Sequence, residues 1–335
     1  MPALLPLPSN RPPARFYRGG SRIASFRGEP AAGSHEPEDW IASATTLAGE
    51  RSLGLTTLPD GRLLADAIRA DAGTWLGPVH LAAFGDDPRL LVKLLDAGQR
   101  LPVHAHPDDA FAAREVHRAH GKTEAWYVLE GGTVHLGLRR DVDPHELARL
   151  VDGQETDALL GLLHERRVEP GDAVLVPAGV LHAVGAGILL LELQQPEDLS
   201  ILLEWSGFEI DGAQHGHLGL GFDRALTAVE RRARTDAEID ALITHDAVGA
   251  SVLPAAADPF FRLERHVAEP DSPVELDPGF AVIVVAQGDV LLSGGGEELL
   301  SPRGSTVLVP HAAGGIRVSG SGEILVCRPP HPLFS

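Results

Sequence analysis

The sequence predicts a mainly β protein that contains two related β-barrels with helical insertions. Its apolar runs are short, and Gly, Pro or Asp bounds each of them, which is the pattern expected for strands of barrels and sandwiches. Gly and Pro are frequent, at 37 and 26 of 335 residues. The runs that fit this pattern are LLVKLL, AWYVLE, AVLVPA, ILLLEL, AVIVVA, STVLVP and EILVCR.

An internal repeat predicts the second barrel. Residues 171–177 read GDAVLVP and residues 304–310 read GSTVLVP, so each copy starts with Gly and ends with Pro after a β-rich core. A unit that recurs in this way indicates two related barrels. His182 lies five residues after the first copy, whereas Gly315 lies five residues after the second. We therefore expect the second barrel to be structural.

Helical patterns interrupt the strands in three places. Residues 61–70 (GRLLADAIRA) form one short candidate helix. Residues 144–163 hold two more, PHELARLV and TDALLGLL, each with Asp or Thr as an N-cap. Residues 223–243 are expected to be the longest helical stretch, split into two helices near Thr235 and Asp236.

Composition excludes several classes of partner. The chain has 28 Lys and Arg against 47 Asp and Glu, a formal net charge of −19, so the basic footprint of a nucleic-acid-binding protein is absent. A few cations could still bind a small anionic substrate. No apolar run is long enough for a membrane span, and the Pro-rich N-terminus lacks the pattern of a signal peptide. With Cys327 as the single cysteine, we expect a reducing, cytoplasmic location.

Three histidines and one glutamate form a candidate metal site. His104 and His106 alternate on a predicted strand, so both imidazoles point to the same face. His182 follows in GDAVLVPAGVLHAVG, and Glu124 lies between the two segments. Three imidazoles and a carboxylate suit a divalent metal such as Zn, Fe or Mn.

The spacing of these residues resembles the cupin superfamily. In its first motif, Gly and five residues precede His-x-His, and Glu with six residues precedes a second Gly. The matching residues are Gly98, His104, His106, Glu124 and Gly131. In its second motif, Gly and five residues precede Pro-x-Gly, and His follows after two more. The matching residues are Gly171, Pro177, Gly179 and His182.

An insertion between His106 and Glu124 narrows the resemblance. VHAHPDDAFA followed by GKTEAWYVL is similar to the class I, cupin-type, mannose-6-phosphate isomerases. Residues 37–43, 88–107 and 177–200 are similar to them as well. The resemblance covers about the first two-thirds of the chain well and the last third weakly.

The resemblance implies a fold of two tandem cupin (jelly-roll) β-barrels. Residues 1–250 would form the metal-binding domain, with helical insertions at about 141–167 and 211–248. Residues 251–335 would form a degenerate barrel without metal. The oligomeric state is left open.

The resemblance also implies a metal-dependent interconversion of mannose 6-phosphate and fructose 6-phosphate through an enediol(ate). The metal would polarise the carbonyl and its neighbouring hydroxyl, and an acid/base group would move a proton between C1 and C2. Zn²⁺ is the expected cofactor, with Fe, Mn, Co or Ni as alternatives. Lys122 matches the family lysine that handles substrate and protons, and metal proximity would lower its pKa. Glu192, which alternates with Gln194 on a predicted strand, is the second candidate catalytic residue or a structural one.

The chain departs from the family pattern at two positions. His104 stands where Gln is usual, which shifts affinity toward softer metals. Leu202 or Leu203 stands where the family has an Arg, and Glu204 adds a negative charge. Arg22, Arg114 or Arg118 could replace that Arg.

These departures leave three other functions open. One is an isomerase or epimerase of a non-phosphorylated sugar, another is a non-catalytic sugar-binding protein, and the third is a cupin dioxygenase. Asp108 or Asp109 is expected to cap the following helix, and His215 and His217 are weak candidates for lining the site.

Overall fold

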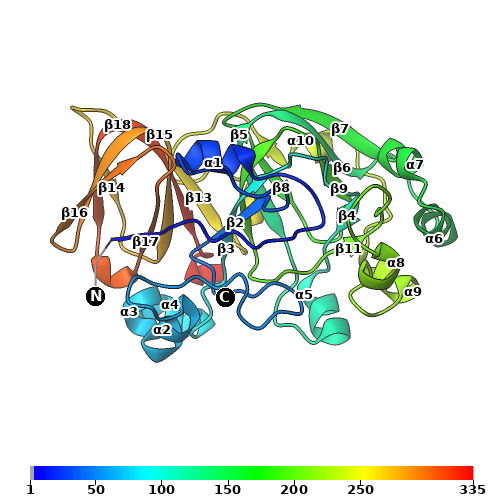
Figure 1. Ribbon diagram of the computed structural model, residues 1–335, viewed down its shortest axis with the longest axis horizontal. Coiled ribbons are helices and arrows are strands. Elements are labelled where there is room, and N and C mark those ends of the chain that lie inside the picture. Colours follow the sequence, from blue (N-terminus) through cyan, green and yellow to red (C-terminus); the bar gives the residue numbers. More distant parts are fainter. Residues whose placement is uncertain (1–3, 335) are drawn as a thin grey trace.

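The computed structural model describes residues 4–334, and the fold is mainly β, as predicted (Figure 1). The strands form three antiparallel sheets. The six-stranded sheet contains β2 (Glu38–Ile41), β3 (Leu91–Asp96), β5 (Glu124–Glu130), β8 (Ala173–Val176), β10 (Leu189–Gln194) and β12 (Ile243–Thr244). The five-stranded sheet contains β4 (His104–Ala105), β6 (Gly132–Leu138), β7 (Leu163–Val168), β9 (His182–Val184) and β11 (Ile201–Leu202). The seven-stranded sheet contains β1 (Leu5–Pro6), β13 (Arg262–Ala268), β14 (Val274–Leu276), β15 (Ala281–Gly294), β16 (Glu297–Pro302), β17 (Thr306–Val309) and β18 (Ile316–Arg328).

The six-stranded sheet is buried on both faces. One face meets the five-stranded sheet, whose Leu136 and Val184 belong to the same apolar cluster as Leu191 of β10. The other face meets the seven-stranded sheet, which adds Val284 and Leu325 to that cluster. Burial on both faces explains why its strands are near-continuous apolar runs without polar alternation.

The seven-stranded sheet separates two cores. Along β15, Val282 and Val284 belong to the cluster shared with the six-stranded sheet, whereas Ile283 and Val285 belong to a second cluster inside the C-terminal half. This alternation follows from the two-residue period of a strand. One apolar core therefore joins the two halves of the molecule, which lie side by side in Figure 1.

The N-terminal segment connects the two halves. Strand β1 pairs with β17, and β2 pairs with β3. Between them, Arg27 donates from Nε to Asp39 Oδ2 at 2.6 Å and from an NH2 group to Thr306 Oγ1 at 3.0 Å. The segment thus contributes strands to a sheet in each half.

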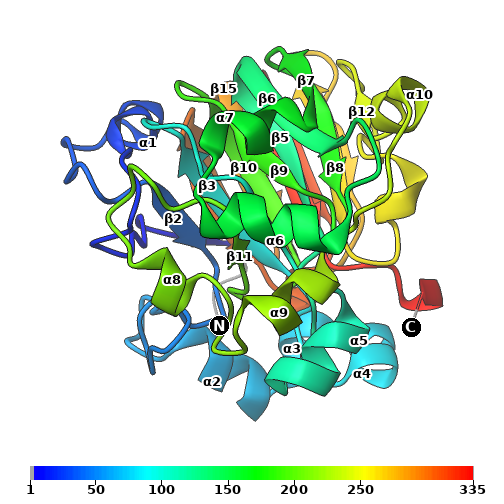
Figure 2. The ribbon, with the colours of Figure 1, turned by 90° about the vertical axis from the view of Figure 1, so that its right-hand side faces the viewer.

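Short helices cover the outer surfaces. They are α1 (Ser21–Arg27), α2 (Leu64–Ala70), α3 (Ala72–Leu76), α4 (Pro78–Phe84), α5 (Asp109–Phe111), α6 (Pro144–Asp152), α7 (Thr156–Gly161), α8 (Gly212–His215), α9 (Phe222–Ala225) and α10 (Asp236–Asp240). A π-helical turn spans Ala112–Val116, and 3₁₀ turns span Leu226–Ala228, Ala255–Ala257, His311–Ala313 and Pro332–Phe334. Leu147, Leu150 and Leu159 of α6 and α7 pack with Leu181, which directly precedes β9, so these helices cover the outer face of the five-stranded sheet (Figure 2).

The helices predicted at residues 61–70 and 144–163 are confirmed, but the long helical stretch at residues 223–243 is wrong. Only α9, a 3₁₀ turn and α10 are helical there. The chain between them runs extended beside β6, where Ala233 bridges Leu138 and the Arg234 amide donates to Leu138 O at 2.8 Å. These backbone hydrogen bonds outweigh the helix propensity. Helix α10 does begin after Thr235, whose side chain forms a capping box with Glu238. In the described part of the chain, no helix has the length and apolar character needed to cross a bilayer.

The shared core predicts a large effect at Phe261, which is fully buried in it. Phe261→Ala is expected to lower the free energy of unfolding by about 3–5 kcal/mol, because it leaves a cavity between the two halves. Val267→Ala is the control, since this side chain of the adjoining strand is 46% exposed. Urea unfolding of both variants measures the effect. Equal urea midpoints for the two variants would show that Phe261 does not contribute to a core shared by the two halves.

Candidate active site

Backbone pairing brings the three predicted histidines together. Strands β4 and β9 pair with His104 directly opposite His182. His106 lies just beyond the end of β4, which is shorter than the predicted strand, and the Gly179 amide donates to His106 O at 2.7 Å. The ligand atoms of His104, His106 and His182 all lie within 4.8 Å of one another.

The three imidazoles are oriented as metal ligands. Each Nδ1 faces a backbone carbonyl: Pro102 O at 2.8 Å for His104, Leu199 O at 2.7 Å for His106 and Val180 O at 2.9 Å for His182. Donation from Nδ1 fixes the tautomer that leaves the Nε2 lone pair free to bind a metal. His182 Nε2 is buried and makes no hydrogen bond. The donor set therefore fits a divalent metal ion.

The electrostatic environment keeps the imidazoles of His104 and His106 neutral. Burial lowers the pKa of His106 to about 3, with a further contribution from Lys122. Burial and the two neighbouring histidines also hold the pKa of His104 well below its ordinary value. A neutral imidazole is the form that binds a metal.

Glu124 opens β5 next to the histidines. Its Oε2 lies 3.1 Å from His106 Nε2, and its Oε1 lies 3.4 Å from His182 Nε2. Trp126 Nε1 donates to Oε1 at 2.9 Å and orients the carboxylate. Burial alone would raise the pKa of Glu124, but Lys122 and His106 hold it well below its ordinary value. Glu124 is thus an ionised carboxylate in contact with two of the three imidazoles.

Lys122 lies in the site but not on the predicted strand face, because β5 begins only at Glu124. The preceding loop carries it, and its amide donates to Pro107 O at 2.9 Å. Gly121 allows this close crossing, since a Cβ there would lie 2.4 Å from Pro107 O. Lys122 Nζ lies 2.7 Å from Glu124 Oε2 and 3.3 Å from Glu192 Oε1.

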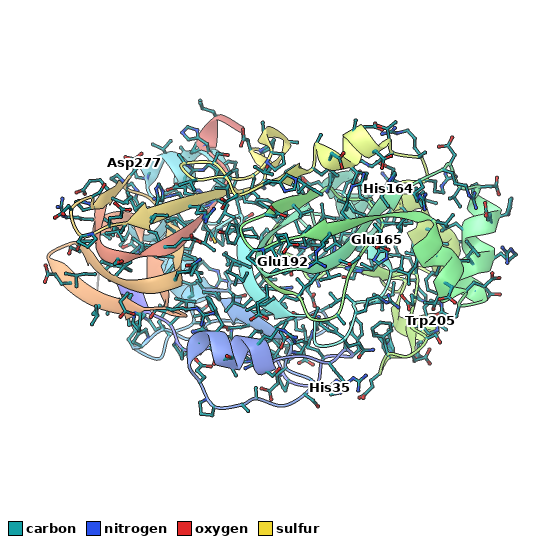
Figure 3. All side chains as sticks on the ribbon, turned by 90° about the horizontal axis from the view of Figure 1, so that it is seen from above. His35, His164, Glu165, Glu192, Trp205 and Asp277 are labelled. Carbon is teal, nitrogen blue, oxygen red and sulfur yellow. The ribbon has the colours of Figure 1, made fainter. Side chains whose placement is uncertain are left out.

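Two carboxylates contact the Lys122 ammonium group, which the sequence did not predict. Burial acts to lower the pKa of Lys122, but the carboxylates of Glu124 and Glu192 raise it above its ordinary value. The lowering expected from a neighbouring metal ion stays a prediction. Burial raises the pKa of Glu192 to about 7, with Lys122 opposing the shift and Glu124 adding to it. Glu192 lies in the interior of the molecule, away from the rim where His35 and Trp205 lie (Figure 3).

A second buried charge network beside these residues was not predicted. Glu38 accepts from Tyr17 Oη at 2.6 Å and from Trp40 Nε1 at 2.6 Å. It also pairs with Arg15 Nε at 2.9 Å and lies 3.6 Å from Lys93 Nζ. Lys93 stands opposite Glu192 in the pairing of β3 with β10, which connects this network to the histidine site.

The sequence does carry an indication of Lys93. It is the one charged residue within the apolar run LLVKLL, on a strand buried along its whole length. Lys93 and Lys122 are also the only two lysines in the chain, whose other cationic side chains are arginines and histidines. Both lysines lie in the same pocket.

This pocket has a volume of about 50 Å³. Its charged and polar lining residues are Arg15, Tyr17, Glu38, Lys93, His104, Lys122, Glu124, Glu192, Asp198 and Ser200. A wider pocket of about 590 Å³ adjoins it. The two share Arg15, Phe16, Asp198, Ser200 and Leu202. The histidine site therefore lies in an inner pocket that continues into an outer one.

Of the three arginines considered as replacements for the family Arg, only Arg118 lines either of these two pockets. Leu202 lines both pockets, so an apolar side chain does stand there. Arg22 pairs instead with Asp96 and Glu130, and Arg114 pairs with Glu115. Arg118 lines the outer pocket.

The negative charge expected from Glu204 near the site is wrong. Glu204 is buried and pairs with the guanidinium of Arg100 at 2.8 Å, and it accepts from the Val103 amide at 2.9 Å. These donors neutralise its charge within the fold.

The remaining residues that the sequence singled out have structural roles or lie at the edge of the site. Asp108 caps α5 by accepting from the Phe111 amide at 2.7 Å, as expected. His215 lines the outer pocket, whereas His217 Nδ1 accepts from the Gly221 amide. Gln194 is buried and donates to Glu197 O at 2.6 Å, which is a structural role.

Comparisons with known proteins agree with the resemblance seen in the motifs. No family model matches the chain. Mannose-6-phosphate isomerase ManA of Bacillus subtilis (strain 168) is 27% identical over 249 residues, which is 72% of this chain and 75% of that protein. The crystal structure of the mannose 6-phosphate isomerase from Bacillus subtilis has a TM-score of 0.75 at 20% identity, covering 98% of this chain and 100% of that one. A mannose 6-phosphate isomerase bound with zinc and yttrium has the same TM-score at 15% identity and the same coverage. The chain is thus similar, as a divergent relative, to the mannose-6-phosphate isomerases in sequence and fold.

The histidine geometry predicts that His182→Ala weakens zinc binding by at least tenfold. Mutating a residue that only hydrogen-bonds to a metal ligand already costs about 10- to 100-fold in metal affinity, so loss of a ligand should cost at least as much. Zinc content after loading and desalting, measured by atomic spectrometry, tests this. His145→Ala is the control, because this side chain is exposed on α6. Wild-type zinc content in the His182→Ala variant would remove His182 from the ligand set.

Proposed function

We propose that this chain, a divergent relative of the class I mannose-6-phosphate isomerases, is a metal-dependent aldose–ketose isomerase that interconverts mannose 6-phosphate and fructose 6-phosphate. The observation that carries the proposal is the convergence of three imidazoles on one point, with Lys122, Glu124 and Glu192 in contact beside them. The relatives and structural neighbours that bear this activity in their names support it.

In this proposal His104, His106, His182 and Glu124 hold the metal. Zinc is the preferred ion because three imidazoles and a carboxylate suit it, and one structural neighbour is bound with zinc. Fe, Mn, Co and Ni remain alternatives for a set rich in imidazole. When bound, the ion supplies Lewis-acid polarisation of the sugar's C1 and C2 oxygens.

Lys122 and Glu192 are our candidates for proton transfer. Their side chains meet at 3.3 Å inside the pocket, so both can face the same substrate carbons, and a proton on either one can be transferred to them. Lys122 also contacts His106 Nε2 at 3.2 Å, which places its ammonium group next to the metal site. Moving one proton from C2 to C1 and one from O2 to O1 through an enediol then converts the aldose into the ketose.

We further infer two tandem cupin barrels, with a metal-binding domain at residues 1–250 and a metal-free one at 251–335. The two repeat copies support this, since GDAVLVP contains β8 and GSTVLVP contains β17. The pairing of β1 with β17 means that the first domain lends a strand to the second. A cytoplasmic location is part of the proposal and rests on the single buried cysteine.

One observation favours a second substrate, a non-phosphorylated hexose. The carboxylates of Asp198 and Glu38 line the pocket, and the apolar Leu202 stands where the family has a cationic side chain. Assays of fructose 6-phosphate, fructose and mannose with zinc-loaded protein separate the two. We expect turnover of the phosphorylated sugar to exceed that of the free sugars. Turnover of free sugars alone would establish the second function, and binding without any turnover would make the protein a sugar-binding one.

The proposed role of Lys122 predicts that Lys122→Met lowers kcat by about 10²- to 10⁴-fold, the usual contribution of a general acid/base group. Its zinc content should stay at the wild-type value, because Lys122 is not a ligand. Lys122→Arg is the matched control, since Arg keeps the charge but does not release its proton. Steady-state kinetics measure both variants. High activity in Lys122→Arg would show that the residue acts by charge alone.

A further inference from the structure

We propose that Arg15 and Arg118 form the phosphate-binding subsite of this enzyme, in the outer pocket next to the metal site. The inference rests on the proposed function and names the residues that would distinguish a phosphorylated from a free sugar. It also names side chains that would bind the phosphate in the absence of the family Arg.

The arrangement of the two pockets sets where a phosphate would lie. The inner pocket contains the histidine site, and the outer pocket continues from it past five shared residues. In a hexose 6-phosphate the reacting C1 and C2 lie at the opposite end of the carbon chain from the phosphate. A substrate with its reacting end among the histidines therefore directs its phosphate toward the outer pocket.

Arg15 stands where the two pockets meet. Its Nε donates to Glu38, while one of its NH2 groups lies 3.9 Å from Asp198 Oδ1, beyond hydrogen-bond distance. A guanidinium offers five N–H donors in a fixed fork, so a free edge remains for an anion. The side chain is 14% exposed, which matches a group that reaches the pocket from a buried position.

The backbone holds Arg15 in this place. The Arg15 amide donates to His35 O at 3.0 Å, and His35 Nδ1 lies 2.7 Å from Arg15 O. Further along, Gly19 crosses β3 so closely that a Cβ there would lie 2.0 Å from Asp96 O. The guanidinium is therefore presented by a fixed segment, which limits the entropy lost when it binds an anion.

Arg118 approaches the outer pocket from another element. It follows the π-helical turn, which ends at His117 in the left-handed region with φ of 55°. Its Nε lies 4.0 Å from Glu197 Oε2, and its side chain is 51% exposed. This loose pairing leaves its donors available to a ligand.

The outer pocket is lined by charges of both signs. Arg15 and Arg118 are its guanidinium groups, and His215 adds an imidazole. Asp198 is its carboxylate, and it accepts from the Ala48 amide at 3.1 Å. Glu38 pairs with Arg15 and Glu197 lies near Arg118, so the N–H donors that these contacts leave over, not a net positive charge, would hold the phosphate.

The test compares phosphorylated substrate with inorganic phosphate. Arg118→Met should raise the KM for mannose 6-phosphate by about 10- to 100-fold, the effect of losing hydrogen bonds to a charged group. Its kcat should change far less. Calorimetric titration with inorganic phosphate should show weaker binding by a similar factor. Arg15→Lys should show an intermediate loss, because it keeps a charge but not the fork.

Arg114→Met is the matched control, since Arg114 belongs to the same π-helical turn but is outside both pocket linings. Its KM and phosphate affinity should equal the wild-type values. Unchanged phosphate binding in Arg118→Met and Arg15→Lys, or no phosphate binding by the wild-type protein, would overturn the subsite. Failure of the wild-type protein to isomerise mannose 6-phosphate would instead overturn the proposed function, so the two failures are separate.

Discussion

The pairing of β4 with β9 is the constraint on which the candidate site depends. It sets His104 opposite His182, and the chain beyond β4 adds His106 to the same point. Three backbone carbonyls then fix the tautomer of each ring. These contacts come from the strands and from the backbone just outside them, so the fold itself orients the three imidazoles.

The pocket next to the histidines is a buried set of alternating charges. Lys122 bridges Glu124 and Glu192, and Glu192 stands opposite Lys93 in the sheet. Burying such charges is costly unless each is paired, so the network stabilises the fold only as a complete set. The same condition explains why the two lysines of the chain lie here together. Removing one partner would leave an uncompensated charge against the substrate.

The cluster of three histidines could be predicted from the sequence because strand alternation and Gly/Pro spacing locate these residues locally. Arg15 and Lys93 were missed because the contacts that bring them to the site join segments distant in sequence. The contacts of Lys122 with two carboxylates were missed for the same reason, since Glu124 and Glu192 reach it from β5 and β10. The helix at residues 223–243 failed because hydrogen bonds to Leu138 hold that segment extended. Local sequence patterns thus located the histidine cluster, whereas contacts between segments distant in sequence determined the remaining features.

Metal-dependent isomerisation can be tested by a metal titration. Protein stripped with a chelator would be titrated with Zn²⁺ while the conversion of mannose 6-phosphate to fructose 6-phosphate is followed. We expect no activity at the start and a linear rise that ends at about one zinc per chain, as expected for a single three-histidine site. Full activity in the stripped protein, or none at any metal content, would contradict it.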